Sequence, residues 1–205
     1  MRKQLMILAA VALVFGAVNA SAATQATNTN TISPTLKINV TVQDAIQLTL
    51  STSAIAGSCT VNAGGGADYN VSFGTVDALG INPATCGSLY APTTPGVTNS
   101  AYYSAYVLTP VYTSQAVATN TVKAYVSTNF AKANLSVVYS TAAPAGIGSL
   151  SAMGTTPATA NTLLTNAVSG TAQTQYVGVE VAPTNGSATY TGADSAIVTY
   201  TLTVI

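Results

Sequence analysis

A long alternating run, Thr35 to Leu50, constrains this chain more than any other stretch of its sequence. Its even positions are all apolar apart from Asp44, and most of its odd positions carry Thr, Asn or Gln. Because successive side chains of a strand point to opposite faces, the run predicts β-structure with one buried face and one wet face. Fully extended it would measure about 50 Å, whereas strands usually contain about five or six residues. We therefore expect two strands in series, one of which reaches outside its own domain.

The first residues predict export. Arg2 and Lys3 precede an almost wholly apolar run from Leu5 to Val18, and residues 20–22 are small. This pattern is typical of a secretory signal peptide, here residues 1–22, cut after Ala22. The apolar run is shorter than the roughly 20 residues of a membrane-spanning helix. We expect a secreted protein that leaves the membrane once the signal peptide is cleaved.

The composition excludes several classes of partner. Only 5% of the residues are charged, and removal of residues 1–22 leaves three basic and five acidic side chains, a net charge of −2. No basic patch remains for nucleic acid or anionic lipid. Roughly 180 mature residues can bury a substantial core, and no linker or internal repeat indicates a second domain.

The mature chain contains two cysteines, Cys59 and Cys86. An even number of cysteines in an exported protein usually forms disulfides, and two cysteines allow only one pairing. A redox or metal site would need CxxC spacing or histidine partners, and the sequence has neither. We expect a structural disulfide that stabilises the fold by about 3–4 kcal/mol.

Short alternating segments separated by turn residues continue to the end of the chain. They predict strands over Tyr69–Phe73, Ala101–Tyr112, Val122–Thr128, Leu135–Tyr139, Tyr176–Val181 and Ala196–Ile205. We expect Val122–Thr128 and Leu135–Tyr139 to form a hairpin, and Pro110 to lie at a sheet edge or a strand end. Ser140–Thr174 is rich in small residues and predicts either a short helix or a long loop. The fold class is all-β, most simply a β-sandwich.

Catalytic residues are scarce. Histidine is absent from the whole sequence, which removes the usual general base, the usual zinc ligand and a Ser-His-Asp triad. The acidic residues lie on separate segments without a recognisable pairing: Asp44, Asp68, Asp77, Glu180 and Asp194. We predict that the protein is not an enzyme and has no metal or cofactor site.

Several of these features, taken in chain order, resemble the subunits of chaperone-usher pilins, especially the spore coat U-like branch. They are the signal peptide, the alternating N-terminal strand, the cysteine pair, the segment VSFGTVDALG and the final YTGADSAIVTYTLTVI. In that family a Phe-Gly turn, here Phe73-Gly74, follows a strand, and a last strand of alternating Val, Thr and Tyr closes the chain.

The resemblance implies an incomplete, immunoglobulin-like β-sandwich that is completed by a donor strand from a neighbouring subunit. The expected domains are then the signal peptide, an N-terminal extension over 23–44 with Asp44 as its boundary, and a pilin-like sandwich over 45–205. The expected donor residues are Leu36, Ile38, Val40 and Val42. The expected acceptor groove lies beside Val198, Tyr200, Leu202 and Val204.

The same resemblance implies a homopolymer of identical subunits in an extracellular filament at the cell surface. Adhesion or biofilm formation is the expected role of such a filament. A periplasmic chaperone and an outer-membrane usher are the partners implied during export.

Other interpretations stay open. A self-contained adhesin or glycan-binding sandwich would pair the whole Thr35–Leu50 run within its own subunit, and Tyr102, Tyr103 and Tyr106 could line a sugar platform. Tyrosines in strands are, however, more often packing partners. A surface-layer or coat protein would associate laterally. If the donor is instead the preceding segment, residues 23–34, the whole alternating run stays in its own sheet.

Overall fold

The structure is a computed structural model that describes residues 37–40, 45–113, 119–183 and 192–205. Contacts divide the chain into two units, Met1–Val42 and Gln43–Ile205. The first unit contributes only residues 37–40 to the description, and these lie in no strand. The predicted signal peptide lies outside the described residues. Among the described residues, no helical segment has the length and apolar character that a membrane span requires.

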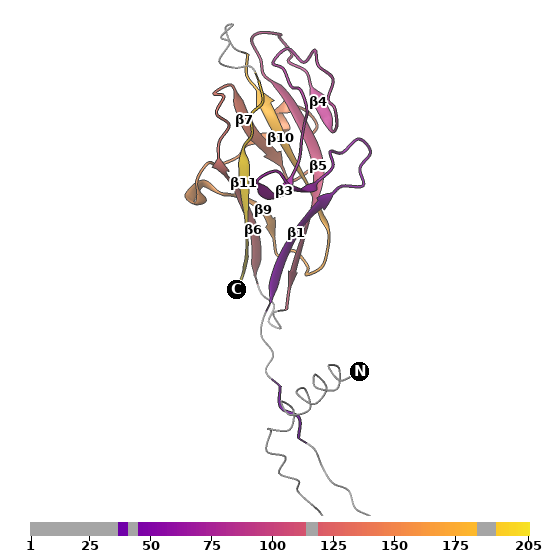
Figure 1. The fold of residues 1–205 in the computed structure, drawn as a ribbon, viewed down its shortest axis with the longest axis vertical. Coiled ribbons are helices and arrows are strands. Elements are labelled where there is room, and N and C mark those ends of the chain that lie inside the picture. Colours follow the sequence, from indigo (N-terminus) through magenta and orange to yellow (C-terminus); the bar gives the residue numbers. More distant parts are fainter. Residues whose placement is uncertain (1–36, 41–44, 114–118, 184–191) are drawn as a thin grey trace, which may run out of the picture. The chain divides into compact units, whose positions relative to one another are not determined.

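The second unit is a sandwich of antiparallel sheets, which confirms the predicted fold class (Figure 1). One sheet has six strands in the order β1-β5-β10-β7-β8, with β4 also paired to β5. Its strands are β1 (Ile46–Thr52), β4 (Ser88–Tyr90), β5 (Ser100–Tyr112), β7 (Leu135–Ser140), β8 (Ser151–Ala152) and β10 (Gln173–Val181).

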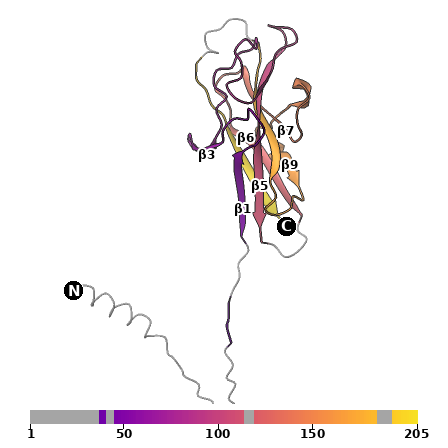
Figure 2. The same cartoon turned by 90° about the vertical axis from the view of Figure 1, so that its right-hand side faces the viewer.

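The opposite sheet has three strands in the order β11-β6-β9. These are β6 (Asn120–Thr128), β9 (Asn161–Thr165) and β11 (Ile197–Val204). A separate hairpin joins β2 (Asn62–Gly64) to β3 (Ala67–Asn70), and two short 3-10 turns lie at η1 (Ile147–Ser149) and η2 (Pro157–Thr159). Figure 2 shows β1, β5 and β6 running along the same axis.

The core lies between the two larger sheets because their central strands alternate. Tyr106 and Leu108 of β5 meet Val122, Ala124 and Val126 of β6 in one buried cluster. The intervening β6 residues, such as Lys123, face outward. A second, smaller cluster is built around Tyr102, Val179 and Val181. The alternation read from sequence thus becomes the inner face of the sandwich.

Three strand predictions are confirmed with small changes in their bounds. The predicted strands at Ala101–Tyr112, Tyr176–Val181 and Ala196–Ile205 become β5, β10 and β11. Pro110 lies near the end of β5, beyond the residues that pair with β10. The strand-end interpretation of this proline is therefore right, although β5 is a central strand.

The predicted hairpin of Val122–Thr128 with Leu135–Tyr139 is wrong. Both segments are strands, but β6 pairs with β11 and β9, whereas β7 pairs with β10 and β8. The connection crosses from one sheet to the other, so that Val122 and Val137 enter the same core cluster from opposite sides.

Two other segments differ from their predictions. The strand expected at Tyr69–Phe73 is instead β3, which ends at Asn70 because it pairs only with the short β2. In Ser140–Thr174, where a short helix or a long loop was expected, Leu163 and Leu164 form the buried part of strand β9. Ile46 also differs from its prediction. The alternation places it on the same strand face as Leu48 and Leu50, yet its side chain, at the start of β1, is 61% exposed.

Candidate binding groove

A long groove opens into the sandwich between β11 and the inner face of the six-stranded sheet. Its volume is about 1880 Å³, well above the roughly 300–1,000 Å³ of pockets for small molecules. Its walls come from β1, β5, β7 and β10, from residues 192–200 leading into and along β11, and from residues 65–78. These dimensions suit a segment of polypeptide better than a small ligand.

The groove is lined by apolar side chains that are only half-buried. Leu48 and Leu50 of β1, Val177 of β10, and Val198 and Tyr200 of β11 all pack against the main core cluster while lining the groove. A sandwich normally covers such side chains with a neighbouring strand. Here the core continues into the groove without a described strand to cover it.

The two strands that flank the groove are both edge strands. In the part of the chain that the structure describes, β11 pairs only with β6, and β1 pairs only with β5. Figure 1 shows β11 and β1 with the small strand β3 drawn between them. An edge strand presents backbone N–H and C=O groups to any extended chain that lies beside it.

Two tyrosines join the sheets at the floor of the groove. The hydroxyl of Tyr200 donates a hydrogen bond to the hydroxyl of Tyr106, and their rings meet edge-to-face with centroids 6.1 Å apart. Burial raises the pKa of Tyr200 to about 12, even though its hydrogen bond with Tyr106 acts in the opposite direction. Burial also raises the pKa of Tyr106 well above its usual value. Both hydroxyls are therefore neutral at physiological pH.

One end of the groove is held by Asp194. Its carboxylate accepts hydrogen bonds from the backbone N–H groups of Ala131, Lys132 and Ser195, and Lys132 Nζ donates to the carbonyl oxygen of Ala193. Burial alone would raise the pKa of Asp194, but these backbone hydrogen bonds and the charge of Lys132 lower it overall. The contacts fix the entry to β11 against the connection between β6 and β7.

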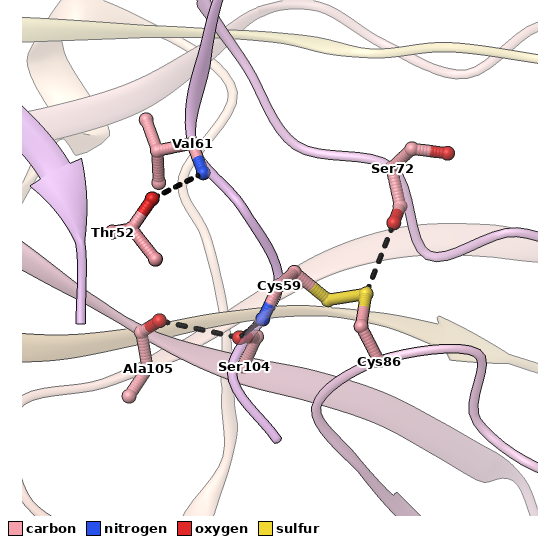
Figure 3. The surroundings of a disulfide bond; sticks show 7 residues. All are labelled: Thr52, Cys59, Val61, Ser72, Cys86, Ser104 and Ala105. Atoms are coloured by element: carbon pink, nitrogen blue, oxygen red, sulfur yellow. Dashed lines mark hydrogen bonds between the residues drawn. A yellow bond between two sulfur atoms is a disulfide. The ribbon is translucent and has the colours of Figure 1, made fainter. Parts of the chain in front are cut away.

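The disulfide holds the base of the β2–β3 hairpin (Figure 3). Cys59 and Cys86 are bonded as predicted. The N–H of Cys59 donates to Ser104 Oγ at 2.7 Å, and the Sγ of Cys86 lies 3.2 Å from the carbonyl oxygen of Ser72. The N–H of Val61 also donates to Thr52 Oγ1 at 2.9 Å. Both feet of the hairpin that borders the groove are thus tied to the body of the sandwich.

The predicted acceptor residues divide into two pairs. Val198 and Tyr200 line the groove, while Leu202 packs against the core beyond it and Val204 lies half-buried near the end of β11. Of the predicted donor residues, Ile38 and Val40 are 77% and 78% exposed and lie in no strand. The other two, Leu36 and Val42, lie outside the described residues.

Sequence reasoning missed most of the opposite wall. Val177 and Val179 of β10 and Leu135 of β7 line the groove, yet nothing in their local pattern distinguishes them from ordinary core residues. The pairing of β10 between β5 and β7 places them there. That pairing joins residues far apart in the chain and has no local signal.

The tyrosines considered as a sugar platform do not share a surface. Tyr102 and Tyr106 are 0% and 3% exposed in the core, whereas Tyr103 stacks on Tyr90 on the other face of the sheet, with centroids 4.9 Å apart. Within the described residues, no three His, Cys, Asp or Glu side chains gather as a metal site would require. The carboxylate of Asp77 accepts hydrogen bonds from backbone N–H groups of its own loop, at Leu79, Ile81 and Asn82.

The sequence matches no protein-family model, and no curated protein or solved structure is significantly similar to it.

Proposed function

We propose that this chain is a structural subunit of an extracellular filament, in which the N-terminal segment of one copy fills the groove of the next copy. The observation that carries the proposal is the half-buried apolar groove beside the edge strand β11. An inserted strand would cover the exposed part of the core and pair with the edge backbone at the same time.

The N-terminal segment has the pattern that such a groove requires. Leu36, Ile38, Val40 and Val42 share one strand face, and the described members of this set, Ile38 and Val40, are largely exposed in the isolated chain. Burial of four aliphatic side chains contributes about 6–12 kcal/mol per joint before the cost of ordering the segment. Backbone hydrogen bonds add strength, and the alternation sets the register.

The way the filament grows follows from the positions of the N-terminal segment and the groove. The segment and the groove are different surfaces of the same chain, so each copy can both give and receive a strand. Such heterologous contacts do not close on themselves unless the rotation is favourable, and they generate open filaments. The resemblance to chaperone-usher pilins supports the same proposal, and with it secretion, cell-surface location and a role in adhesion or biofilm formation.

Full-length variants test the proposal. Ile38→Asp with Val40→Asp places two charges on the donor face and should abolish assembly, because neither charge can be paired in an apolar groove. Asn39→Asp with Thr41→Asp adds the same charge on the opposite face and is the matched control. Filament yield, measured by sedimentation and electron microscopy, should fall by at least tenfold for the first variant and stay near wild type for the second.

A deletion gives an independent check. A chain that lacks residues 23–42 should be monomeric, and a synthetic peptide of residues 35–44 should raise its thermal midpoint. Filaments formed by the deleted chain would refute strand donation by this segment. A third outcome is possible: the deletion abolishes filaments, but both full-length charge variants assemble with equal yield. That result would place the donor strand in residues 23–34.

A further inference from the structure

Six of the eight large exposed aliphatic side chains among the described residues of the sandwich unit lie towards its two ends. We call the end of β5 at Ser100 the head and the end at Tyr112 the tail. Single exposed apolar residues are normal on protein surfaces and need no explanation. Here, however, three of them lie in loops at the head and three lie at the tail.

The head patch consists of Leu79, Ile81 and Val97, which are 46%, 75% and 72% exposed. The N–H groups of Leu79 and Ile81 donate to Asp77 Oδ1 at 2.8 and 3.1 Å, and the hydroxyl of Ser100 donates to the carbonyl oxygen of Asp77. These bonds fix the loop over the start of β5. Tyr102 reinforces it by donating to the carbonyl oxygen of Asn82. Leu79 and Ile81 are thus presented by an ordered loop, and Val97 lies three residues before the start of β5, where its N–H donates to the carbonyl oxygen of Thr94.

The tail patch consists of Ile46, Val168 and Ile205, which are 61%, 67% and 85% exposed. Ile46 pairs with Tyr112 at the end of β5. Val168 precedes a turn in which the N–H of Gly170 donates to the carbonyl oxygen of Pro110, and Ile205 donates to Thr119. Strand pairing and turn geometry therefore hold all three residues at the same end.

The short step between the donor segment and the sandwich limits where the next subunit can lie. Two residues separate Val42 from Ala45, so the Cα atoms of Val42 and Ala45 lie at most about 11 Å apart. The N–H of Ala45 donates to Thr113 Oγ1 at 2.8 Å, which anchors it at the tail. If Val42 ends in the groove of another copy, the mouth of that groove must lie close to the tail patch.

Along β11, the edge strand that a donor would pair with, the groove lining begins at the head and stops short of the tail. It includes Asp77, Ala78 and Gly192 at the head and ends on β11 at Tyr200, although on β1 it extends to Leu48, two residues from Ile46. A donor segment that leaves the groove through this mouth brings its own tail to the head of the acceptor.

From these observations we propose that the tail patch of one copy packs against the head patch of the next, as a second contact at every joint. The inference rests on the proposed function, because the donor segment is what brings the two ends together. The contact would turn a flexible string of subunits into a stiff filament, since two separate attachments restrict rotation at the joint.

Disulfide cross-linking of the full chain tests the contact. The chain has no free cysteine, so Ile81→Cys combined with Val168→Cys introduces the only reactive pair. Oxidised filaments of this variant should give a ladder of covalent oligomers on a non-reducing gel. Each single variant should give none, because head does not meet head. Ile55→Cys with Val168→Cys is the matched control, since Ile55 is 48% exposed but lies outside both patches.

A second variant measures the consequence for the filament. Ile81→Ser with Val97→Ser should assemble with the yield of wild type, because the groove is unchanged, but the persistence length in electron micrographs should fall several-fold. An unchanged persistence length, or a ladder of equal strength from the Ile55 control pair, would overturn the proposed contact.

The outcomes separate this inference from the donor-strand proposal. Filaments that survive Ile38→Asp with Val40→Asp contradict strand donation by this segment, whatever the cross-linking result. If the wild-type chain forms no filaments, strand donation fails as well, and the end-to-end contact survives only if the Ile81 and Val168 pair still links soluble subunits. Loss of that cross-link in normal filaments contradicts the contact alone.

Discussion

Tyr200 on β11 and Tyr106 on β5 are joined through their hydroxyl groups at 3.2 Å, across the gap between the two sheets. Each tyrosine belongs to a different sheet, and their rings also meet edge-to-face. This pair therefore ties the edge strand beside the groove to the central strand of the opposite sheet. Among the described residues the backbone of β11 pairs only with β6, so this contact is a side-chain link between β11 and the opposite sheet.

Tyr200→Phe should lower the free energy of unfolding by about 1 kcal/mol. The change keeps the aromatic packing but leaves the buried hydroxyl of Tyr106 without this partner. Urea denaturation followed by fluorescence measures the effect. Tyr125→Phe on β6 is the matched control for the same substitution at a half-buried tyrosine. A larger loss from the control than from Tyr200→Phe would show that the hydroxyl pair contributes no stability.

The same pair sets an alkaline limit. In the unfolded chain a tyrosine ionises near pH 10, whereas burial holds the pKa of Tyr200 at about 12 in the folded chain. Between these values the unfolded state loses protons that the folded state keeps. The free energy of unfolding therefore falls as the pH rises from 10 towards 12. Tyr200→Phe should weaken this dependence, which denaturation at several alkaline pH values can measure.

Replacement of Cys59 and Cys86 together by Ala should destabilise the fold by about 3–4 kcal/mol. The bond joins residues 27 apart, and the chain-entropy model gives this value for a loop of that length. Denaturation of the variant and of the reduced wild type should give the same midpoint. A midpoint equal to that of the oxidised wild type would mean that the cross-link does not constrain the unfolded chain.

Asn120→Ala should cost about 2–3 kcal/mol of stability. Asn120 is 2% exposed, and its side chain binds both the N–H and the carbonyl oxygen of Ala167, each at 3.0 Å. It also donates to the hydroxyl of Tyr112 at 3.2 Å. Loss of these bonds leaves buried polar groups without partners. Asn62→Ala, on the exposed strand β2, should change the denaturation midpoint very little.

Acid should loosen the region around Asp194 and Asp77 first. Hydrogen bonds from backbone N–H groups outweigh the effect of burial and lower the pKa of both carboxyls. Their stabilisation is therefore complete above the unfolded value near pH 4 and is lost as the pH falls through the folded values. The protection factors of the amides of residues 131–132, which correct for the intrinsic exchange rate at each pH, should fall at pH 3. Asp194→Asn should show faster exchange there already at pH 7, whereas Asp68→Asn on the exposed strand β3 should not.

Local pattern was enough to predict the strands that alternate cleanly. The alternation from Ala196 to Ile205 predicts that Val198, Tyr200 and Leu202 share one face of a strand, and β11 has that face towards the core. The disulfide also followed from a count, since two cysteines leave one pairing. The alternation is visible within a few residues, and the disulfide needs no choice because only one pairing of the cysteines exists.

The local sequence pattern does not predict which strands pair with each other. Val122–Thr128 and Leu135–Tyr139 looked like neighbours because a short loop joins them, yet they lie in opposite sheets. Ile46 follows the periodicity of its strand but lies at an end where nothing covers it. Periodicity indicates the face of the strand to which a side chain points, whereas the burial of that side chain depends on residues elsewhere in the chain.

The strand order has a consequence for how fast the chain can fold. Thr49 pairs with Thr109, Tyr176 with Ala105 and Thr201 with Lys123, so the ladders of β1 with β5, β10 with β5 and β11 with β6 join residues about 60–80 positions apart at these pairs. Closure of such distant pairs costs chain entropy before contacts repay it, and all-β domains of this kind fold in about milliseconds to seconds. During that time the edges of β11 and of the core strands are unpaired. A newly made chain therefore passes through a slow search in which any extended peptide nearby can compete for its strand edges.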